Sequence, residues 1–283
     1  MSDLFLEAEH AELYRKYRPR YPKEIFEIID RKLTESTAKL PDGLKEKYKR
    51  NREGRWKRAL DVGCGTGQAT LMLLDSVQEI VGLDSSDSQI HQAKIECGDK
   101  DASRVTFLCE DALKISEAFE EDSIDLILVC QAIHWFDRAN FFRECLKVLR
   151  PGGVLALVGY GLPFFNDEVI DKLNREYIDE SLKDSPIRST IDDKYAEVIK
   201  ELRCVFPCVE RDDSIVQNLD STVDEYVGYL STWSNYRTYK RTNPPYPDVL
   251  EVFRQKLQKC VPGDAILKRK FDFFIVFGIK SLK

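Results

Sequence analysis

Three glycines, each separated from the next by one residue, follow an apolar run that is typical of a buried strand. Residues 59–68 read Ala-Leu-Asp-Val-Gly-Cys-Gly-Thr-Gly-Gln. Because glycine has no Cβ atom, this turn can bend tightly and lie flat against a ligand. A dinucleotide-binding turn has the pattern G-x-G-x-x-G, whose third glycine would fall at position 68, where this chain has Gln68. The spacing therefore differs from a dinucleotide turn, and an acid, Asp61, precedes the first glycine.

Asp61 indicates which cofactor suits the turn. A carboxylate at this place attracts a positively charged group, such as the ammonium of the methionine part of S-adenosylmethionine. The same carboxylate would repel a pyrophosphate. The pattern therefore favours S-adenosylmethionine over a dinucleotide, and an ordinary tight turn with a structural Asp is the alternative.

Strands and helices alternate after residue 58, which predicts right-handed crossover units on a mostly parallel sheet. The expected strands are 59–62, 79–84, 105–111, 123–130 and 154–158, and the expected helices are 68–74, 88–97, 115–119 and 140–149. Before them lie helix-prone segments at 23–34 and 44–57. Later segments predict helices within 162–203, 220–239 and up to about residue 259, and strands at 204–217 and 271–277. The two late strands suggest an antiparallel edge on the sheet.

Acidic side chains stand where the expected strands end, and ligands of such sheets bind at the carboxyl ends of the strands. Asp84 ends the second strand, where an acid can accept hydrogen bonds from both hydroxyls of a ribose. Asp111 follows the third strand, where an acid can accept a bond from an adenine amino group. Residues 131–136 follow the fourth strand. In register with the glycine turn, these strand ends predict a nucleoside site, although Asp84 could instead cap the next helix.

The composition and net charge of the chain limit the classes of protein to which it can belong. The chain has 283 residues, of which 43% are hydrophobic and 33% charged, so it is long enough for one sizeable domain. A net charge of −6 argues against nucleic acid as the main partner. The basic segment 45–58 is either a solvated loop or a contact for an anionic surface.

The cysteine and hydropathy patterns bear on metal binding and on the cellular compartment in which we expect the protein. Eight cysteines contain no C-x-x-C pair, and with three histidines they give no support for a metal site. The N-terminus has no signal-peptide pattern, and no apolar stretch is long enough for a membrane span. We therefore expect a cytoplasmic protein without a membrane partner. The sequence carries no indication of oligomeric state.

Four segments resemble motifs of the class I S-adenosylmethionine-dependent methyltransferases: residues 61–67, 82–84, 110–112 and 149–153. Residues 14–22 and 229–236 resemble elements of the trans-aconitate methyltransferase-like branch. The resemblance implies a Rossmann-like α/β fold with a mostly parallel seven-stranded sheet and an antiparallel last strand. It also implies one methyltransferase domain, 1–283. We divide that domain into an N-terminal helical cap (1–57), a cofactor-binding core (58–160) and acceptor-covering helices with the C-terminal strands (161–283).

The resemblance places the N-terminal element over the cofactor, with Tyr17 and Arg18 near its methionine carboxylate. A guanidinium suits that role independently, because it grips a carboxylate in bidentate fashion. The residues expected to bind the cofactor are Tyr17, Arg18, Asp61, Gly63, Cys64, Gly65, Gly67, Asp84, Ser85, Asp111, Ala112 and Gln131. The residues expected to form the acceptor pocket are His134, Trp135, Tyr160, Trp233 and Tyr236.

The expected reaction converts S-adenosylmethionine to S-adenosylhomocysteine and methylates a small molecule. Members of the branch that methylate organic acids use a carboxylate nucleophile, and a pKa of about 4 leaves it ionised at pH 7 without a base. An amine or phenol would need a base, for which His134 is the candidate. Carboxyl O-methylation is the leading hypothesis. The alternatives are N-, S- or phenolic O-methylation and a catalytically silent S-adenosylmethionine-binding module.

Overall fold

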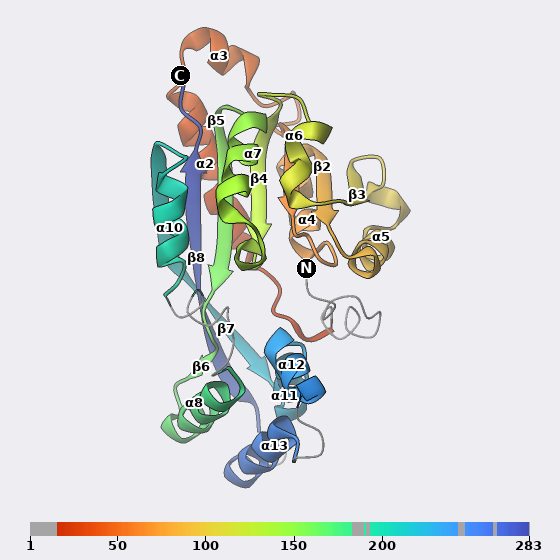
Figure 1. Cartoon of the computed structure of the whole chain (residues 1–283), viewed down its shortest axis with the longest axis vertical. Coiled ribbons are helices and arrows are strands. Elements are labelled where there is room, and N and C mark those ends of the chain that lie inside the picture. Colours follow the sequence, from red (N-terminus) through yellow and green to blue (C-terminus); the bar gives the residue numbers. More distant parts are fainter. Residues whose placement is uncertain (1–15, 183–189, 191–192, 243–246, 263–264, 283) are drawn as a thin grey trace.

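The computed structural model describes residues 16–182, 190, 193–242, 247–262 and 265–282. Its centre is one eight-stranded sheet with the order β3-β2-β1-β4-β5-β8-β6, in which β7 pairs with β8 (Figure 1). Strands β1 to β5 run parallel to one another. The strands are β1 (Trp56–Val62), β2 (Val77–Asp84), β3 (Val105–Cys109), β4 (Ile124–Cys130), β5 (Leu149–Tyr160), β6 (Phe164–Phe165), β7 (Cys208–Ser221) and β8 (Leu267–Ile279).

Helices cover both faces of the sheet because its central strands are apolar on both sides. In β4 all seven residues are buried, and Leu126 and Leu128 face one hydrophobic cluster while Ile127 and Val129 face the other. The first cluster includes residues of α2 (Lys23–Ala38), α4 (Gln68–Met72) and α5 (Asp87–Asp101). The second includes residues of α6 (Ile115–Ala118), α7 (Arg138–Val148) and α10 (Ala196–Arg203). This two-sided cover confirms the predicted α/β fold.

Strand β1 lies between β2 and β4, so the strand order reverses at β1 and β4. In an open α/β sheet, that reversal opens a crevice at the carboxyl ends of the two strands. The glycine turn follows β1, and the 3₁₀ helix η4 (Ile133–Trp135) follows β4 closely. The fold therefore brings these two predicted motifs to one place.

The late strands form the predicted antiparallel edge and also extend it. β8 pairs antiparallel with β5 from Val154↔Ile279 to Tyr160↔Phe273, and with β7 along its whole length. Beyond Tyr160, the short strand β6 pairs with β8, so the sheet has eight strands and not the seven expected. The ribbon of β7 and β8 carries a lobe of helices beyond the carboxyl ends of the parallel strands (Figure 1). That lobe contains α8 (Glu168–Leu182), α11 (Val223–Ser231), α12 (Ser234–Thr242) and α13 (Val249–Cys260).

Several predicted boundaries were wrong. The helix expected over 44–57 is only α3 (Asp42–Lys47), because the Asn51 side chain accepts bonds from the backbone N–H groups of Glu53 and Arg55 and closes a turn. Strand β5 begins directly after α7, so Pro-Gly-Gly at 151–153 lies inside a strand. The helix expected over 220–239 is two helices that meet at residues 232 and 233. Residues 14 and 15 of the N-terminal element lie outside the described residues.

The basic segment 45–58 is largely neutralised by nearby acids. Its ion pairs are Lys45–Asp42, Lys49–Glu46, Arg50–Asp30, Arg55–Glu53 and Arg58–Glu79. The segment lies at the end of the sheet opposite the crevice (Figure 1). These partners favour the solvated-loop interpretation over an anionic contact.

The structure also bears on membrane and metal binding. Within the described ranges, no helix is long and apolar enough to cross a bilayer. In the same part of the chain, no group of three or more His, Cys, Asp or Glu side chains is arranged to hold a metal ion. The eight cysteines are free thiols.

Candidate active site at the glycine turn

The glycines of the turn serve different physical needs. All three have positive φ, at 73° for Gly63, 55° for Gly65 and 81° for Gly67. A Cβ atom on Gly63 would lie 2.5 Å from the Cβ of Ala132, and one on Gly67 would lie 2.9 Å from the ring of Phe107. A Cβ on Gly65 would meet nothing nearer than 3.9 Å. Packing therefore requires the outer two glycines, while the middle one leaves its open side to a ligand.

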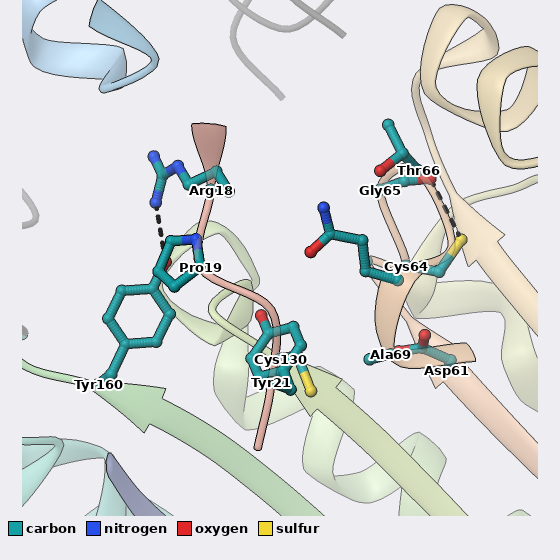
Figure 2. A pocket seen from close by; sticks show the side chains of 12 residues that line it. Arg18, Pro19, Tyr21, Asp61, Cys64, Gly65, Thr66, Ala69, Cys130 and Tyr160 are labelled. Carbon is teal, nitrogen blue, oxygen red and sulfur yellow. Dashed lines mark hydrogen bonds between the residues drawn. The ribbon is translucent and has the colours of Figure 1, made fainter. Parts of the chain in front are cut away.

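Two cavities flank the turn and share Gly63. The first is lined by Arg18, Pro19, Tyr21, Asp61, Gly63, Cys64, Gly65, Thr66, Gln68, Ala69, Cys130 and Tyr160 (Figure 2). The second has a volume of about 250 Å³ and is lined by Val62, Gly63, Leu83, Asp84, Ser85, Glu110, Asp111, Ala112, Leu113, Trp135, Phe136 and Asp137. Most of the residues predicted from the strand ends thus meet around one turn.

Asp61 presents an unsatisfied carboxylate oxygen in the first cavity. The residue is fully buried, and its Oδ2 accepts a 2.6 Å hydrogen bond from Thr70 Oγ1. Its Oδ1 is buried and, within the described ranges of the chain, has no hydrogen-bond partner. Burial, and then the nearby charge of Asp84, raise the pKa of Asp61 to about 7. A buried acceptor in this state gains from a cationic ligand, because the cation supplies both the missing donor and a compensating charge.

Arg18 stands on the other side of the first cavity in the view of Figure 2. Its Nε donates to Thr232 Oγ1 at 3.0 Å, and its Nη1 donates to the Tyr160 hydroxyl at 3.1 Å. These bonds tie the segment before α2 to the end of α11 and to the end of β5. The cavity therefore lies between Asp61 and a fixed cation, an arrangement that suits a zwitterionic amino-acid group.

Asp84 both holds the turn and lines the second cavity. Its Oδ2 accepts from the Gly65 backbone N–H at 2.9 Å, and its Oδ1 accepts from that of Ser86 at 2.9 Å. The side chain is largely buried, which raises its pKa, while the backbone bonds oppose that shift. Each carboxylate oxygen can accept a second bond, so Asp84 can hold the turn and still receive ribose hydroxyls.

Asp111 lies at the far end of the second cavity. Its Oδ1 accepts a 3.0 Å bond from the Leu113 backbone N–H and so caps the 3₁₀ helix η3 (Ala112–Lys114). The side chain is exposed, and Ser85 and Ala112 line the same cavity. An acceptor therefore stands at the end of each of β1, β2 and β3, as a nucleoside site requires.

The sequence of the chain is similar to those of known methyltransferases. Residues 60–157 match the family model described as a methyltransferase domain. A Dictyostelium discoideum protein named as a methyltransferase is 28% identical over 276 residues, which cover 95% of this chain and 92% of that protein. The Saccharomyces cerevisiae protein CRG1, named as a probable S-adenosylmethionine-dependent methyltransferase, is 23% identical over 78% of this chain and 85% of its own length.

Among solved structures, one described as a type II methyltransferase from Anaeromyxobacter dehalogenans superposes with a TM-score of 0.68. It is 26% identical and covers 94% of this chain and 100% of its own. The chain is a class I S-adenosylmethionine-dependent methyltransferase. Its cofactor is therefore S-adenosylmethionine. The narrower resemblance to the trans-aconitate methyltransferase-like branch stays a prediction.

His134 of the methyltransferase lies in η4, which follows β4, and β4 is the neighbour of β1 in the sheet. Its Nδ1 is buried, and none of the described residues forms a hydrogen bond with it. Burial, then the positive charges of Arg18 and Arg138, lower the pKa of His134 to about 4. The imidazole is therefore neutral at pH 7, and it is a weak base there.

Six of the predicted site residues line neither cavity of the methyltransferase: Gly67 and His134, described above, and four others. Tyr17 packs against Gly228, where a Cβ atom would lie 2.7 Å from its ring. Gln131 donates from Nε2 to the Tyr160 carbonyl at 3.0 Å and ties β4 to β5. Trp233 packs edge-on against Tyr229, and the Tyr236 hydroxyl donates to Asp248 at 2.7 Å. These contacts hold elements together, and the roles predicted for the four residues stay untested.

Several lining residues of the methyltransferase were not among the site residues predicted from the sequence. Tyr21, Thr66 and Cys130 line the first cavity, and Glu110 and Phe136 line the second. Each is a close neighbour in sequence of a residue that was predicted. The rule that ligands gather at strand ends could have found Cys130, because it is the last residue of β4.

Proposed function

We propose that this methyltransferase transfers the methyl group of S-adenosylmethionine to a carboxylate of a small organic acid. The observation that carries the proposal is the charge around His134. The guanidinium groups of Arg18 and Arg138 both contribute to its lowered pKa. Arg138 is paired with Glu201 at 2.6 Å, so the attraction for an anionic acceptor rests on Arg18, which lines the first cavity. The same shift leaves His134 poorly suited to take a proton from an amine or phenol at pH 7.

The cofactor's placement is part of the proposal. The unpartnered Oδ1 of Asp61 suits the ammonium, and Arg18 suits the carboxylate of the methionine part. Asp84 suits the ribose hydroxyls, and Asp111 suits the adenine amino group across the second cavity. Gly65, whose open side faces no protein atom within 3.9 Å, leaves room for the ligand between these groups.

S-adenosylmethionine supplies a methyl group that its sulfonium already activates, and transfer to an acceptor breaks the carbon–sulfur bond and leaves S-adenosylhomocysteine. The chain must then position the acceptor and exclude water. A carboxylate with a pKa of about 4 is ionised at pH 7, so no side chain has to remove a proton. Tyr21 and Tyr160, which line the first cavity, cover it from the N-terminal segment and from β5.

We further propose that one domain combines three parts: a cap in residues 1–57, a cofactor-binding core in 58–160 and an acceptor-covering part in 161–283. The hydrogen bonds from Arg18 to Tyr160 and Thr232 support this division, because one residue of the cap joins the core to the later lobe. The lobe of α8 and α11 to α13 lies beyond the carboxyl ends of the parallel strands, which suits a cover for the acceptor (Figure 1).

The test is transfer of labelled methyl from S-adenosylmethionine to small molecules of a cell extract. The proposal predicts a labelled product that mild base hydrolyses, since a methyl ester is base-labile. A base-stable product would indicate an N-, S- or phenolic O-methyltransferase. Tight S-adenosylmethionine binding without any labelled product would indicate a catalytically silent module.

A further inference from the structure

Arg269 is a buried cation that forms no ion pair with any of the described residues. It lies on β8, between Phe165 of β6 and Leu219 of β7, and only 7% of its surface is exposed. Its Nε and Nη1 are buried and have no hydrogen-bond partner among the residues that the structure describes. Within the described part of the chain, no carboxylate forms an ion pair with it. A buried charge is costly unless it is paired, so this guanidinium is suited to an anion from outside the chain.

Aromatic rings surround the guanidinium. Its Cζ lies 5.1 Å from the ring centroid of Tyr229, 5.5 Å from that of Tyr226 and 5.6 Å from that of Phe271. Ring faces attract a guanidinium, but they do not occupy its N–H groups as a carboxylate would. The rings therefore hold Arg269 in place and leave its hydrogen-bonding capacity unused.

Arg269 is connected to the methyltransferase site through these rings. The ring of Tyr229 also lies 5.6 Å from the Cζ of Arg18, which lines the first cavity. The ring of Phe271 packs edge-on against Tyr160, 5.5 Å away, and Tyr160 lines the same cavity. Tyr160, Tyr229 and Phe271 thus form an aromatic cluster with Arg18 on one side and Arg269 on another.

We propose that Arg269 is a specificity-determining residue that binds a carboxylate of the methyl acceptor, distinct from the acceptor atom that receives the methyl group. This inference deepens the proposed function and rests on it. Arg18 lines the first cavity and Arg269 does not, so the anchored carboxylate and the cofactor's own carboxylate have different cations. The acceptor then carries two acidic groups, one held by Arg269 and one presented to the methyl donor.

The alternative is that Arg269 has only a packing role, in which its aliphatic stem and the aromatic rings fill space inside the lobe. In that account a methionine of similar length would serve equally well, and acids would bind the variant as they bind the wild type. Arg211 provides a matched control. It also lies over an aromatic ring, 4.8 Å from that of Phe274, but it has a carboxylate partner, Asp213, at 2.7 Å.

The experiment measures binding of succinate, glutarate and citrate by calorimetry with saturating S-adenosylhomocysteine, and the neutral diamide of succinate is the ligand control. We expect at least one acid to bind the wild type while the diamide does not. Arg269→Met should raise the dissociation constant of that acid at least tenfold, with the affinity for S-adenosylhomocysteine unchanged. Arg211→Met should bind both ligands as the wild type does.

Two results would overturn the role of Arg269 alone: wild-type protein that binds S-adenosylhomocysteine but none of the acids, or Arg269→Met that binds them as tightly as the wild type. Failure of the wild type to bind S-adenosylhomocysteine would instead overturn the proposed function. If Arg269→Met does not fold, Arg269→Lys takes its place, because lysine keeps the charge and loses the planar fork. It should weaken acid binding about tenfold, and unchanged binding would again refute the role.

Discussion

Protonation of Asp61 should control the affinity for the cofactor near neutral pH. Its pKa of about 7 comes first from burial and then from the charge of Asp84. A cationic ammonium binds the ionised carboxylate, so only that fraction of the protein is competent. Roughly nine-tenths is ionised at pH 8 and roughly one-tenth at pH 6, so the apparent affinity should fall about tenfold between them, or about 1.4 kcal/mol.

Calorimetric titration with S-adenosylhomocysteine at pH 6, 7 and 8 measures this change. Repeating the titration at pH 7 in buffers of different ionisation enthalpy should show release of about half a proton on binding. The control is Asp61→Asn, which should bind S-adenosylhomocysteine weakly. Its affinity should lose the pH dependence that the wild type shows between pH 6 and 7. An affinity that is constant from pH 6 to 8 in the wild type would refute the reasoning, as would the same pH dependence in Asp61→Asn.

The same shift has a consequence for stability. The pKa of Asp61 is higher in the folded protein than its ordinary value of 3.8, so folding binds a proton between these two pH values. The contribution of Asp61 to stability is therefore present below about pH 4 and is lost as the pH rises through about 7. Without ligand, Asp61→Asn should melt at a higher temperature than the wild type at pH 8, although it binds the cofactor less well.

Three further predictions concern the turn and the acceptor. Gly65→Ala should weaken S-adenosylhomocysteine binding more than tenfold and lower the free energy of unfolding by about 1–2 kcal/mol, the usual cost of a left-handed backbone conformation at a residue with a Cβ atom. Gly67→Ala should lower the melting temperature further, because its Cβ atom would also contact Phe107. The opposite order of melting temperatures would contradict this assignment. Asp84→Ala should weaken binding by about 1–3 kcal/mol in calorimetry, and an unchanged affinity would move the ribose contact elsewhere. His134→Gln should reduce kcat less than tenfold with a carboxylate acceptor, whereas a loss of about 10² or more would indicate a general base.

The cofactor half of the fold could be predicted because its signals are local. The turn at 63–67, Asp84 and Asp111 each stand directly after a strand, and parallel strands bring such ends together. The sequence also predicted the late antiparallel pairing, because two expected strands, 204–217 and 271–277, have helical inserts between them. It did not predict β6, since a two-residue strand has no periodicity to detect.

The acceptor half could not be predicted because its decisive contacts are distant in sequence. The break between α11 and α12 falls at Thr232, which accepts a bond from Arg18, 214 residues earlier. Tyr236 has helical spacing that suits a pocket, yet its hydroxyl bonds Asp248 of another helix. Arg269 stands out only when its neighbours are known, because its distinguishing property is a missing partner.

The central claim is that the glycine turn divides one cofactor site into an amino-acid part and a nucleoside part. A crystal structure with S-adenosylhomocysteine tests it most directly. We expect the ligand's ammonium within hydrogen-bond distance of Asp61 Oδ1 and its adenine in the cavity lined by Asp111. Density for the ligand away from Gly65, or with the adenine beside Arg18 and the amino acid beside Asp111, would contradict it.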